Sequence, residues 1–158
     1  FTENPDVALG ASQWVNLIKY NKSENNTLNT IKSLRSSGYR IVATTPHTND
    51  TILSELDLSK GKIALLFGSE LPGLSDIALK NSDEFVKIPM FGFTESYNIS
   101  VSAAICLYDL INRLHQSDIM WELSEKEKET ILADWLMISV KDSENIIKTI
   151  QNRTNQVL

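Results

Sequence analysis

The chain has 158 residues, 42% of them hydrophobic and 22% charged, with a formal net charge of −5. These values are typical of one globular domain with a substantial core, and no apolar run approaches the roughly 20 residues of a membrane span. The acidic balance argues weakly against a nucleic-acid partner, because phosphate contacts rest on Lys and Arg. The single cysteine excludes an internal disulfide, and the absence of an export-signal pattern predicts a cytoplasmic protein.

Strands and helices are expected to alternate, which predicts an α/β fold with a parallel sheet. Alternating, β-branched and aromatic residues predict strands over residues 15–20, 39–44, 62–67 and 85–88. Apolar spacing and turn residues predict helices over residues 25–37, 74–81 and 99–114, with one helical turn at 51–56. Because residues 62–67 are nearly all apolar, we expect a central parallel strand covered on both faces.

The predicted helix over residues 99–114 is apolar on most of its surface. One face combines Val101, Ala104, Ile105, Tyr108 and Ile111. Such a helix must be buried nearly all round, by the sheet on one side and by a second surface on the other, for which a subunit interface is a candidate. Cys106 lies in the same pattern and is expected to be a core thiol.

A last helix is predicted where Ser124 and Glu127 form a capping-box pattern. Its apolar stripe consists of Ile131, Trp135 and Ile138 and continues through Ile146, Ile147 and Ile150.

A glycine-rich turn follows the apolar strand, with the pattern Gly68-x-x-x-x-Gly73-Leu74-Ser75. A phosphate-binding P-loop needs Lys where Leu74 stands, so hydrolysis of ATP or GTP is disfavoured. The glycines still allow a sharp turn and a close approach of a ligand to the backbone, although an ordinary strand-to-helix turn explains them equally well. Glu70 in this turn is either an idle surface acid or a ligand-binding carboxylate.

Two further segments carry candidate site residues. Ile88-Pro89-Met90 places a proline just past a strand, which ends ladder pairing and leaves carbonyl groups able to accept from an adenine amine. Ser96-Tyr97-Asn98-Ile99-Ser100 opens the long helix. Helix capping explains part of this polar run, but one cap does not require so many polar groups.

Metal chemistry is not expected, because His47 and His115 have no partners at metal-ligand spacing. A nucleotide phosphohydrolase remains a third possibility that rests only on the incomplete glycine loop.

Taken together, these segments resemble the SpoU/TrmH-type RNA 2′-O-ribose methyltransferases of the SPOUT superfamily. Residues 66–75 look like the second motif of that family, residues 88–104 like its third, and residues 38–44 like the preceding strand. The resemblance covers roughly residues 7–114, and its motifs are specific because order, spacing and residue type agree. Residues 123–136 resemble the C-terminal helical extension of members that modify a guanosine in the tRNA D-loop.

The resemblance implies a parallel α/β sheet with helices on both faces and a deep C-terminal trefoil knot. It also implies a homodimer that packs the long helix across its interface. We expect a methyltransferase domain over residues 1–117, incomplete at its N-terminus, and a C-terminal helical extension over residues 118–158.

The implied reaction transfers a methyl group from S-adenosylmethionine to a ribose 2′-hydroxyl of RNA, with tRNA favoured over rRNA. By family match, the cofactor-binding residues are Thr44, Gly68, Ile88, Met90 and Tyr97. The residues near the reacting ribose, or shaping the knot, are Glu70, Ser96 and Asn98. In-line transfer needs positioning and help with one proton, but no metal.

The family's first motif, which carries an Asn and an Arg assigned to activating the hydroxyl, would lie upstream of Phe1. We therefore expect the chain to be a fragment. The alternative is a non-catalytic RNA- or cofactor-binding module of the same fold.

Overall fold

The structure is a computed structural model that describes residues 14–21, 23–46, 50–69, 71–94 and 96–155. The chain divides into two compact units, Tyr20–Met120 and Phe1–Lys19 with Trp121–Leu158. Among the described residues, no helix combines the length and the apolar character needed to cross a bilayer.

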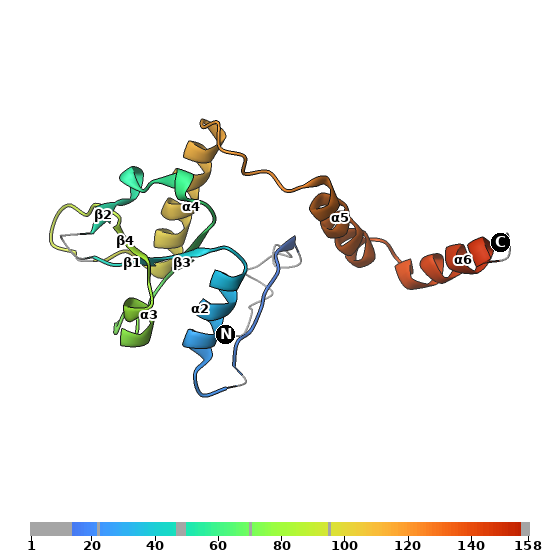
Figure 1. The fold of residues 1–158 in the computed structure, drawn as a ribbon, viewed down its shortest axis with the longest axis horizontal. Coiled ribbons are helices and arrows are strands. Elements are labelled where there is room, and N and C mark those ends of the chain that lie inside the picture. Colours follow the sequence, from blue (N-terminus) through green and yellow to red (C-terminus); the bar gives the residue numbers. More distant parts are fainter. Residues whose placement is uncertain (1–13, 22, 47–49, 70, 95, 156–158) are drawn as a thin grey trace. The chain divides into compact units, whose positions relative to one another are not determined.

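The first unit is built on a parallel sheet of four strands (Figure 1). These are β1 (Arg40–Thr44), β2 (Thr51–Ile52), β3 (Ile63–Leu66) and β4 (Glu84–Lys87), in the order β2-β4-β1-β3. All three pairings between neighbouring strands are parallel. The predicted parallel sheet is confirmed.

The central and fully buried strand is β1, not β3. Ile41, Val42 and Ala43 are each 0% exposed, whereas all four residues of β3 are half-buried. In the described part of the chain, β3 ends the strand order. The expectation of a central strand at residues 62–67 was wrong. An apolar run indicates that both faces of a strand are covered, but it does not indicate which strands lie beside it in the sheet.

Helices cover both faces of this sheet. Successive strand residues point to opposite faces, so Ile41 and Ala43 share one face and Val42 lies on the other. On the first face, α2 (Asn26–Ser36) contacts both β1 and α3 (Asp76–Lys80). On the second face, Val42 packs in a cluster with residues of α4 (Ile99–His115).

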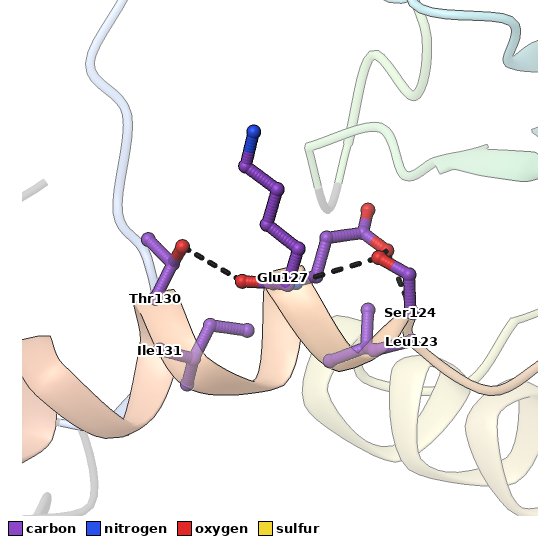
Figure 2. A pocket seen from close by; sticks show the side chains of 6 residues that line it. Leu123, Ser124, Glu127, Thr130 and Ile131 are labelled. Atoms are coloured by element: carbon purple, nitrogen blue, oxygen red, sulfur yellow. Dashed lines mark hydrogen bonds between the residues drawn. The ribbon is translucent and has the colours of Figure 1, made fainter.

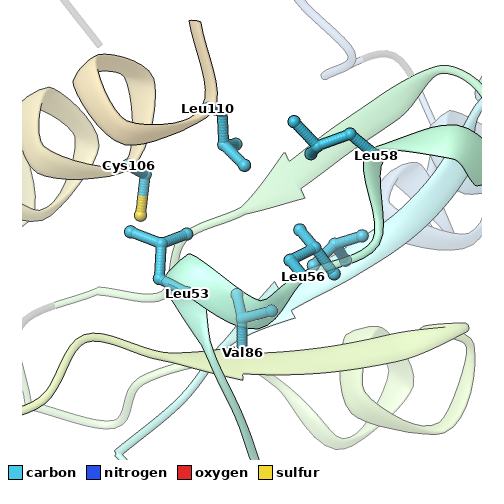
Figure 3. Close-up of a cluster of buried hydrophobic side chains, with 7 residues drawn as sticks. Leu53, Leu56, Leu58, Val86, Cys106 and Leu110 are labelled. Atoms are coloured by element: carbon cyan, nitrogen blue, oxygen red, sulfur yellow. The ribbon is translucent and has the colours of Figure 1, made fainter. Parts of the chain in front are cut away.

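The second face holds the largest group of buried apolar side chains (Figure 3). It comprises Val42, Leu53, Leu56, Leu58, Val86, Cys106 and Leu110. Leu53 and Leu58 begin two short 3₁₀ turns that follow β2, η2 (Leu53–Glu55) and η3 (Leu58–Lys60), and Leu56 is the residue that ends η2. The single helical turn expected at residues 51–56 is therefore a two-residue strand followed by η2. Each fully buried leucine contributes about 1.5–3 kcal/mol.

Cys106 is the predicted core thiol, with 0% exposure. Burial, and next the nearby Asp109 carboxylate, raise the pKa of this thiol to about 11. Leu110 lies one turn further along α4 and is also buried. Of the face expected to pack, only Ile105 contacts the cluster, whereas Val101, Tyr108 and Ile111 are 45%, 76% and 46% exposed. Half of this apolar helix is therefore uncovered within one chain.

A charged side chain joins α4 to the segment between β2 and β3. Arg113 Nη1 donates to Leu53 O at 3.1 Å and Nη2 donates to Leu56 O at 2.6 Å. Arg113 also forms an ion pair with Asp109 one turn earlier, at 3.3 Å. The guanidinium thus donates to two main-chain carbonyl groups of this segment, of which Leu53 O also accepts from Leu56 N at 3.1 Å.

Asp83 links the start of β1 to the end of α2. Its Oδ2 accepts from Ile41 N at 2.6 Å and its Oδ1 accepts from Arg35 Nη2 at 2.5 Å. Partial burial acts to raise the pKa of Asp83, but the hydrogen bonds from Ile41 and Arg35 outweigh it and hold the pKa below 3.8. The helix itself ends as predicted before Gly38, whose φ of +82° suits glycine.

The predicted strand at residues 15–20 was wrong. These residues lie in an irregular segment, and Val15, Leu17 and Ile18 are 66%, 59% and 70% exposed. Alternating apolar residues form a strand only where a neighbouring strand supplies hydrogen-bond partners, and none of the described strands pairs with this segment.

The described part of the second unit includes the helices α5 (Glu125–Ser139) and α6 (Ser143–Asn155). The predicted capping box at the start of α5 is present (Figure 2): Ser124 N donates to Glu127 Oε2 at 2.8 Å, and Glu127 N donates to Ser124 Oγ at 3.4 Å. The expected single helix is broken, because the chain turns at Asp142 with φ +63°. Within this unit, Trp14 and Trp135 pack edge to face, with ring centroids 5.5 Å apart.

Candidate functional site

Three neighbouring strands end at the same edge of the sheet. The order β4-β1-β3 brings together the segments that follow Thr44, Leu66 and Lys87. Thr44 Oγ1 donates to Leu66 O at 2.8 Å, and Thr45 N donates to Val86 O at 2.9 Å. The structure therefore brings together Thr44, the start of the turn at Gly68 and the start of the Ile88–Met90 segment. Ligands of open α/β sheets bind at such carboxyl edges.

The loop after β3 is a tight backbone turn. Ser69 N donates to Gly73 O at 3.1 Å, and Gly73 N donates to Ser69 O at 3.0 Å. A Cβ on Gly68 would lie 2.1 Å from the carbonyl carbon of Gly73, and Gly73 itself has φ +66°. The turn thus leaves no space for a side chain at Gly68 and places Gly73 in a left-handed backbone conformation that favours glycine. Glu70, expected to act near the reacting group, lies outside the described residues, as does His47.

The short helix after this turn has its own cap. Ser75 Oγ accepts from Ala78 N at 3.3 Å and begins α3. Leu74, which stands where a phosphate-binding loop has Lys, is half-buried and supplies no charge.

The segment after β4 leaves the sheet at Ile88. Ile88 is half-buried against the core cluster, Pro89 is exposed, and Met90 is half-buried. The strand ends at Lys87, so the main chain from Ile88 to Met90 is outside the sheet. The proline accounts for this ending, because it has no N–H for a ladder.

The polar run before α4 contains the helix cap. Asn98 Oδ1 accepts from Ser100 N at 2.9 Å, and Asn98 O accepts the first intrahelical hydrogen bond from Ser102 N at 2.9 Å. Asn98 is therefore a structural cap, whatever else it does. Ser96 and Tyr97 precede it as exposed residues, with Tyr97 41% exposed.

Sequence reasoning gave no role to three large apolar side chains at this edge. Leu71, Phe91 and Phe93 are 97%, 92% and 108% exposed. The two phenylalanines flank Gly92, which has φ +106°. The sequence does not mark these rings as exposed, because the run from Ile88 to Phe93 is apolar throughout.

Metal binding has no support in the described part of the chain, where no three His, Cys, Asp or Glu side chains are grouped to hold an ion. Two shallow depressions are lined by residues outside the three segments of the carboxyl edge. One is lined by residues 54–59 together with Arg113, Gln116, Ser117 and Ile119.

The other depression surrounds the first turn of α5 (Figure 2) and is lined by Leu123, Ser124, Lys126, Glu127, Thr130 and Ile131. Several polar groups in these depressions already bind the chain itself: Arg113 donates to two carbonyls, and Ser124 and Glu127 cap a helix. We therefore place the site at the sheet edge.

The SpoU rRNA Methylase family model matches residues 2–108 of the chain. A relative in Borreliella burgdorferi, a tRNA (guanosine(18)-2′-O)-methyltransferase, is 44% identical over 151 residues, which are 96% of this chain and 67% of that protein. A 23S rRNA (guanosine-2′-O-)-methyltransferase, RlmB of Coxiella burnetii, is 36% identical over 104 residues, or 66% of this chain and 39% of that protein.

The fold is similar to a solved structure, that of the A. aeolicus TrmH/SpoU tRNA modifying enzyme. The TM-score is 0.67 at 25% sequence identity, covering 89% of this chain and 70% of the other. The chain thus spans between about two fifths and seven tenths of the length of these three proteins.

Proposed function

The chain belongs to the SpoU rRNA methylase family, and we propose that it is an S-adenosylmethionine-dependent RNA 2′-O-ribose methyltransferase that acts on a guanosine in the D-loop of tRNA. The observation that carries the proposal is the meeting of three family segments at one sheet edge, joined by the hydrogen bond from Thr44 to Leu66. The Borreliella burgdorferi relative, a tRNA (guanosine(18)-2′-O)-methyltransferase, supports tRNA as the substrate.

The backbone of this edge fits a nucleoside cofactor. Gly68 has no room for a Cβ against Gly73, so the turn presents bare main chain, which allows close approach of a ligand. The segment from Ile88 to Met90 is outside the sheet, and main-chain carbonyl groups there can accept from an adenine amine. We assign the adenosine to Thr44, Gly68, Ile88, Met90 and Tyr97, several of them through backbone groups.

The bound cofactor supplies an electrophilic methyl group. The chain must then position the 2′-hydroxyl in line and assist the loss of its proton. We assign Glu70, Ser96 and Asn98 to the reacting ribose or to the shape of the loops around it. Exposure of Ser96 and Asn98 supports access of a large substrate such as RNA.

Two features of architecture belong to the same proposal. The segment between β4 and α4 is proposed to complete a deep trefoil knot, which family membership supports. Residues 1–117 are proposed as the methyltransferase domain and 118–158 as a C-terminal helical extension, supported by the end of α4 at His115 and the capped start of α5 at Ser124.

A homodimer would cover the uncovered face of α4. Val101, Leu107, Tyr108 and Ile111 are 45%, 56%, 76% and 46% exposed on this helix. A helix that is apolar nearly all round is stable in water only when a second surface buries its other side. A second copy of the chain is the proposed surface, and a tRNA substrate places the enzyme in the cytoplasm.

Two measurements test the proposed function. Isothermal titration of the protein that carries this chain with S-adenosylhomocysteine should show saturable binding. Incubation with labelled S-adenosylmethionine should then label a tRNA transcript, but not the same transcript already 2′-O-methylated at its D-loop guanosine. Labelling of a 23S rRNA transcript alone would move the substrate to rRNA. Binding of the cofactor without methylation of any RNA would favour the non-catalytic module.

A further inference from the structure

Two aromatic side chains project into solvent beside the proposed cofactor segment. Phe91 is 92% exposed and Phe93 is 108% exposed. Leaving a phenylalanine in water forgoes about 1.5–3 kcal/mol relative to burying it. Single exposed apolar residues are ordinary, but two rings on one short loop form a local aromatic surface, which we call the Phe91–Phe93 surface.

The backbone holds both rings on a loop outside the sheet. Gly92 has φ +106°, a conformation that L side chains rarely adopt, and no atom outside its neighbours lies within 4 Å of the Cβ it lacks. Glycine is therefore needed at position 92 for its backbone conformation, and not because another group lies too close for a side chain. Its position between the two phenylalanines means that this conformation sets where both rings go.

The Phe91–Phe93 surface is adjacent to the residues assigned to the cofactor. Phe91 directly follows Met90, and Phe93 comes three residues after it. Because a residue extends the chain by at most about 3.6 Å, the Cα of Phe93 lies within roughly 11 Å of that of Met90. An RNA base on these rings and a ribose that faces the cofactor beside Met90 can thus belong to the same nucleotide or to neighbouring ones.

We propose that the Phe91–Phe93 surface stacks on an unpaired nucleobase of the RNA substrate, next to the ribose that is methylated. This inference rests on the proposed function. The net charge of −5 leaves this chain poorly equipped to hold RNA through phosphates alone. Stacking on an aromatic face contributes about 1–3 kcal/mol per base without any charge, and RNA loops are recognised by proteins through splayed, unstacked bases.

The test compares the ring with an aliphatic side chain of similar size. Phe93→Leu and Phe91→Leu keep an apolar side chain but remove the π face, whereas Phe93→Trp retains it. Met120→Leu, at a position that is 98% exposed, is the matched control. Each protein is measured for tRNA affinity by fluorescence anisotropy at several salt concentrations, for S-adenosylhomocysteine affinity by calorimetry, and for mass by sedimentation without RNA.

We expect the Phe→Leu variants to bind tRNA about tenfold or more weakly, which corresponds to the loss of one stacked base. Phe93→Trp and Met120→Leu should bind tRNA as the original protein does, and cofactor affinity and mass should be unchanged throughout. The loss should be the same at every salt concentration, because no phosphate contact is removed.

Unchanged tRNA affinity in both Phe→Leu variants would overturn the inference while leaving the proposed function intact. A fall in mass without RNA would overturn it in favour of a contact between two copies of the chain. If the original protein methylates no RNA, the proposed function is wrong and the stacking surface is wrong with it.

Discussion

Gly68 and Gly73 face each other across the turn that follows β3. A Cβ on Gly68 would lie 2.1 Å from the carbonyl carbon of Gly73 and 2.3 Å from Leu74 N. The obstructing atoms are backbone, which cannot move aside without breaking the two hydrogen bonds between Ser69 and Gly73. The two glycines therefore serve different needs: Gly68 needs space, and Gly73, with φ +66°, needs backbone freedom.

This difference predicts opposite outcomes for two substitutions. Gly68→Ala should open the turn and reduce S-adenosylhomocysteine affinity at least tenfold, because the clash involves main chain. Gly73→Asn should keep most of the affinity, because Asn tolerates left-handed backbone and no atom beyond the neighbouring residues lies within 4 Å of a Cβ at this position. Calorimetric titration of both variants checks this, and equal affinities would contradict the role given to Gly68.

Asn98 offers a way to separate capping from chemistry. Asn98→Ala should lower stability by about 1 kcal/mol through loss of the helix cap and should lower methyl transfer by more than this accounts for. Asn98→Ser is the matched variant, because Ser caps a helix about as well as Asn. Urea unfolding and single-turnover methyl transfer are the measurements.

The expected result for Asn98→Ser is near-original stability with much reduced activity. If activity instead falls only in proportion to stability in both variants, Asn98 is a helix cap and nothing more. Its hydrogen bond with Ser100 N is sufficient for that role.

Sequence reasoning identified the elements that carry a local signal. The capping box at Ser124, the stop at Gly38 and the core position of Cys106 all depend on near neighbours in the chain, and all are present. The predictions that were wrong concern features that depend on residues distant in the sequence. The irregular segment at residues 15–20 lacks a paired strand, and β3 took an outer place that no pattern within residues 62–67 encodes.

The site divides in the same way. Strand ends at Thr44, Gly68 and Ile88 were predicted singly, and the parallel pairing of their strands brings them to one edge. The roles assigned to individual side chains stay predictions. The exposed rings of Phe91 and Phe93 went unnoticed, because exposure is a property of the folded chain.

Asp83 predicts a pH dependence of stability. Its folded pKa lies below 3.8, so its contribution is present at neutral pH and is lost as the pH falls through the folded pKa. Asp83→Asn should be less stable by about 1 kcal/mol at pH 7, a value reduced for partial exposure. The difference should shrink as the pH falls below about 4, where the carboxyl of Asp83 is protonated first in the unfolded chain, and it should be lost once the pH has passed the lowered folded pKa.

Thermal unfolding between pH 3 and 7 measures this dependence. Asp118→Asn, at an exposed position, serves as the control and should leave the pH profile unchanged. A constant difference between the original protein and Asp83→Asn across this range would contradict the assignment.

The uncovered face of α4 predicts the effect of a charge placed on it. Ile111→Lys should convert a dimer into monomers, because an unpaired charge in an apolar interface is strongly unfavourable. Lys32→Glu on the exposed side of α2 is the control and should keep the original mass. Sedimentation equilibrium measures the mass of each protein. If the original protein is itself a monomer, the proposed dimer is wrong.

Cys106 should be unreactive in the folded chain. Its side chain is 0% exposed, and its pKa is raised from 9.0 to about 11, so little thiolate exists at pH 8. Labelling by a disulfide reagent should be on the order of a hundredfold slower than in denaturant. The raised pKa also predicts that stability falls as the pH rises from about 9 toward 11, and Cys106→Ala should lack this fall.

Arg113 has a consequence for the cooperativity of the fold. Its hydrogen bonds to Leu53 O and Leu56 O join residues 60 and 57 positions apart in the chain. The loop that they close contains the turn at Gly68, the Ile88–Met90 segment and the Asn98 cap. We therefore expect local opening of the last turn of α4 to release the η2 turn as well, so that the amide hydrogens of both exchange as one unit.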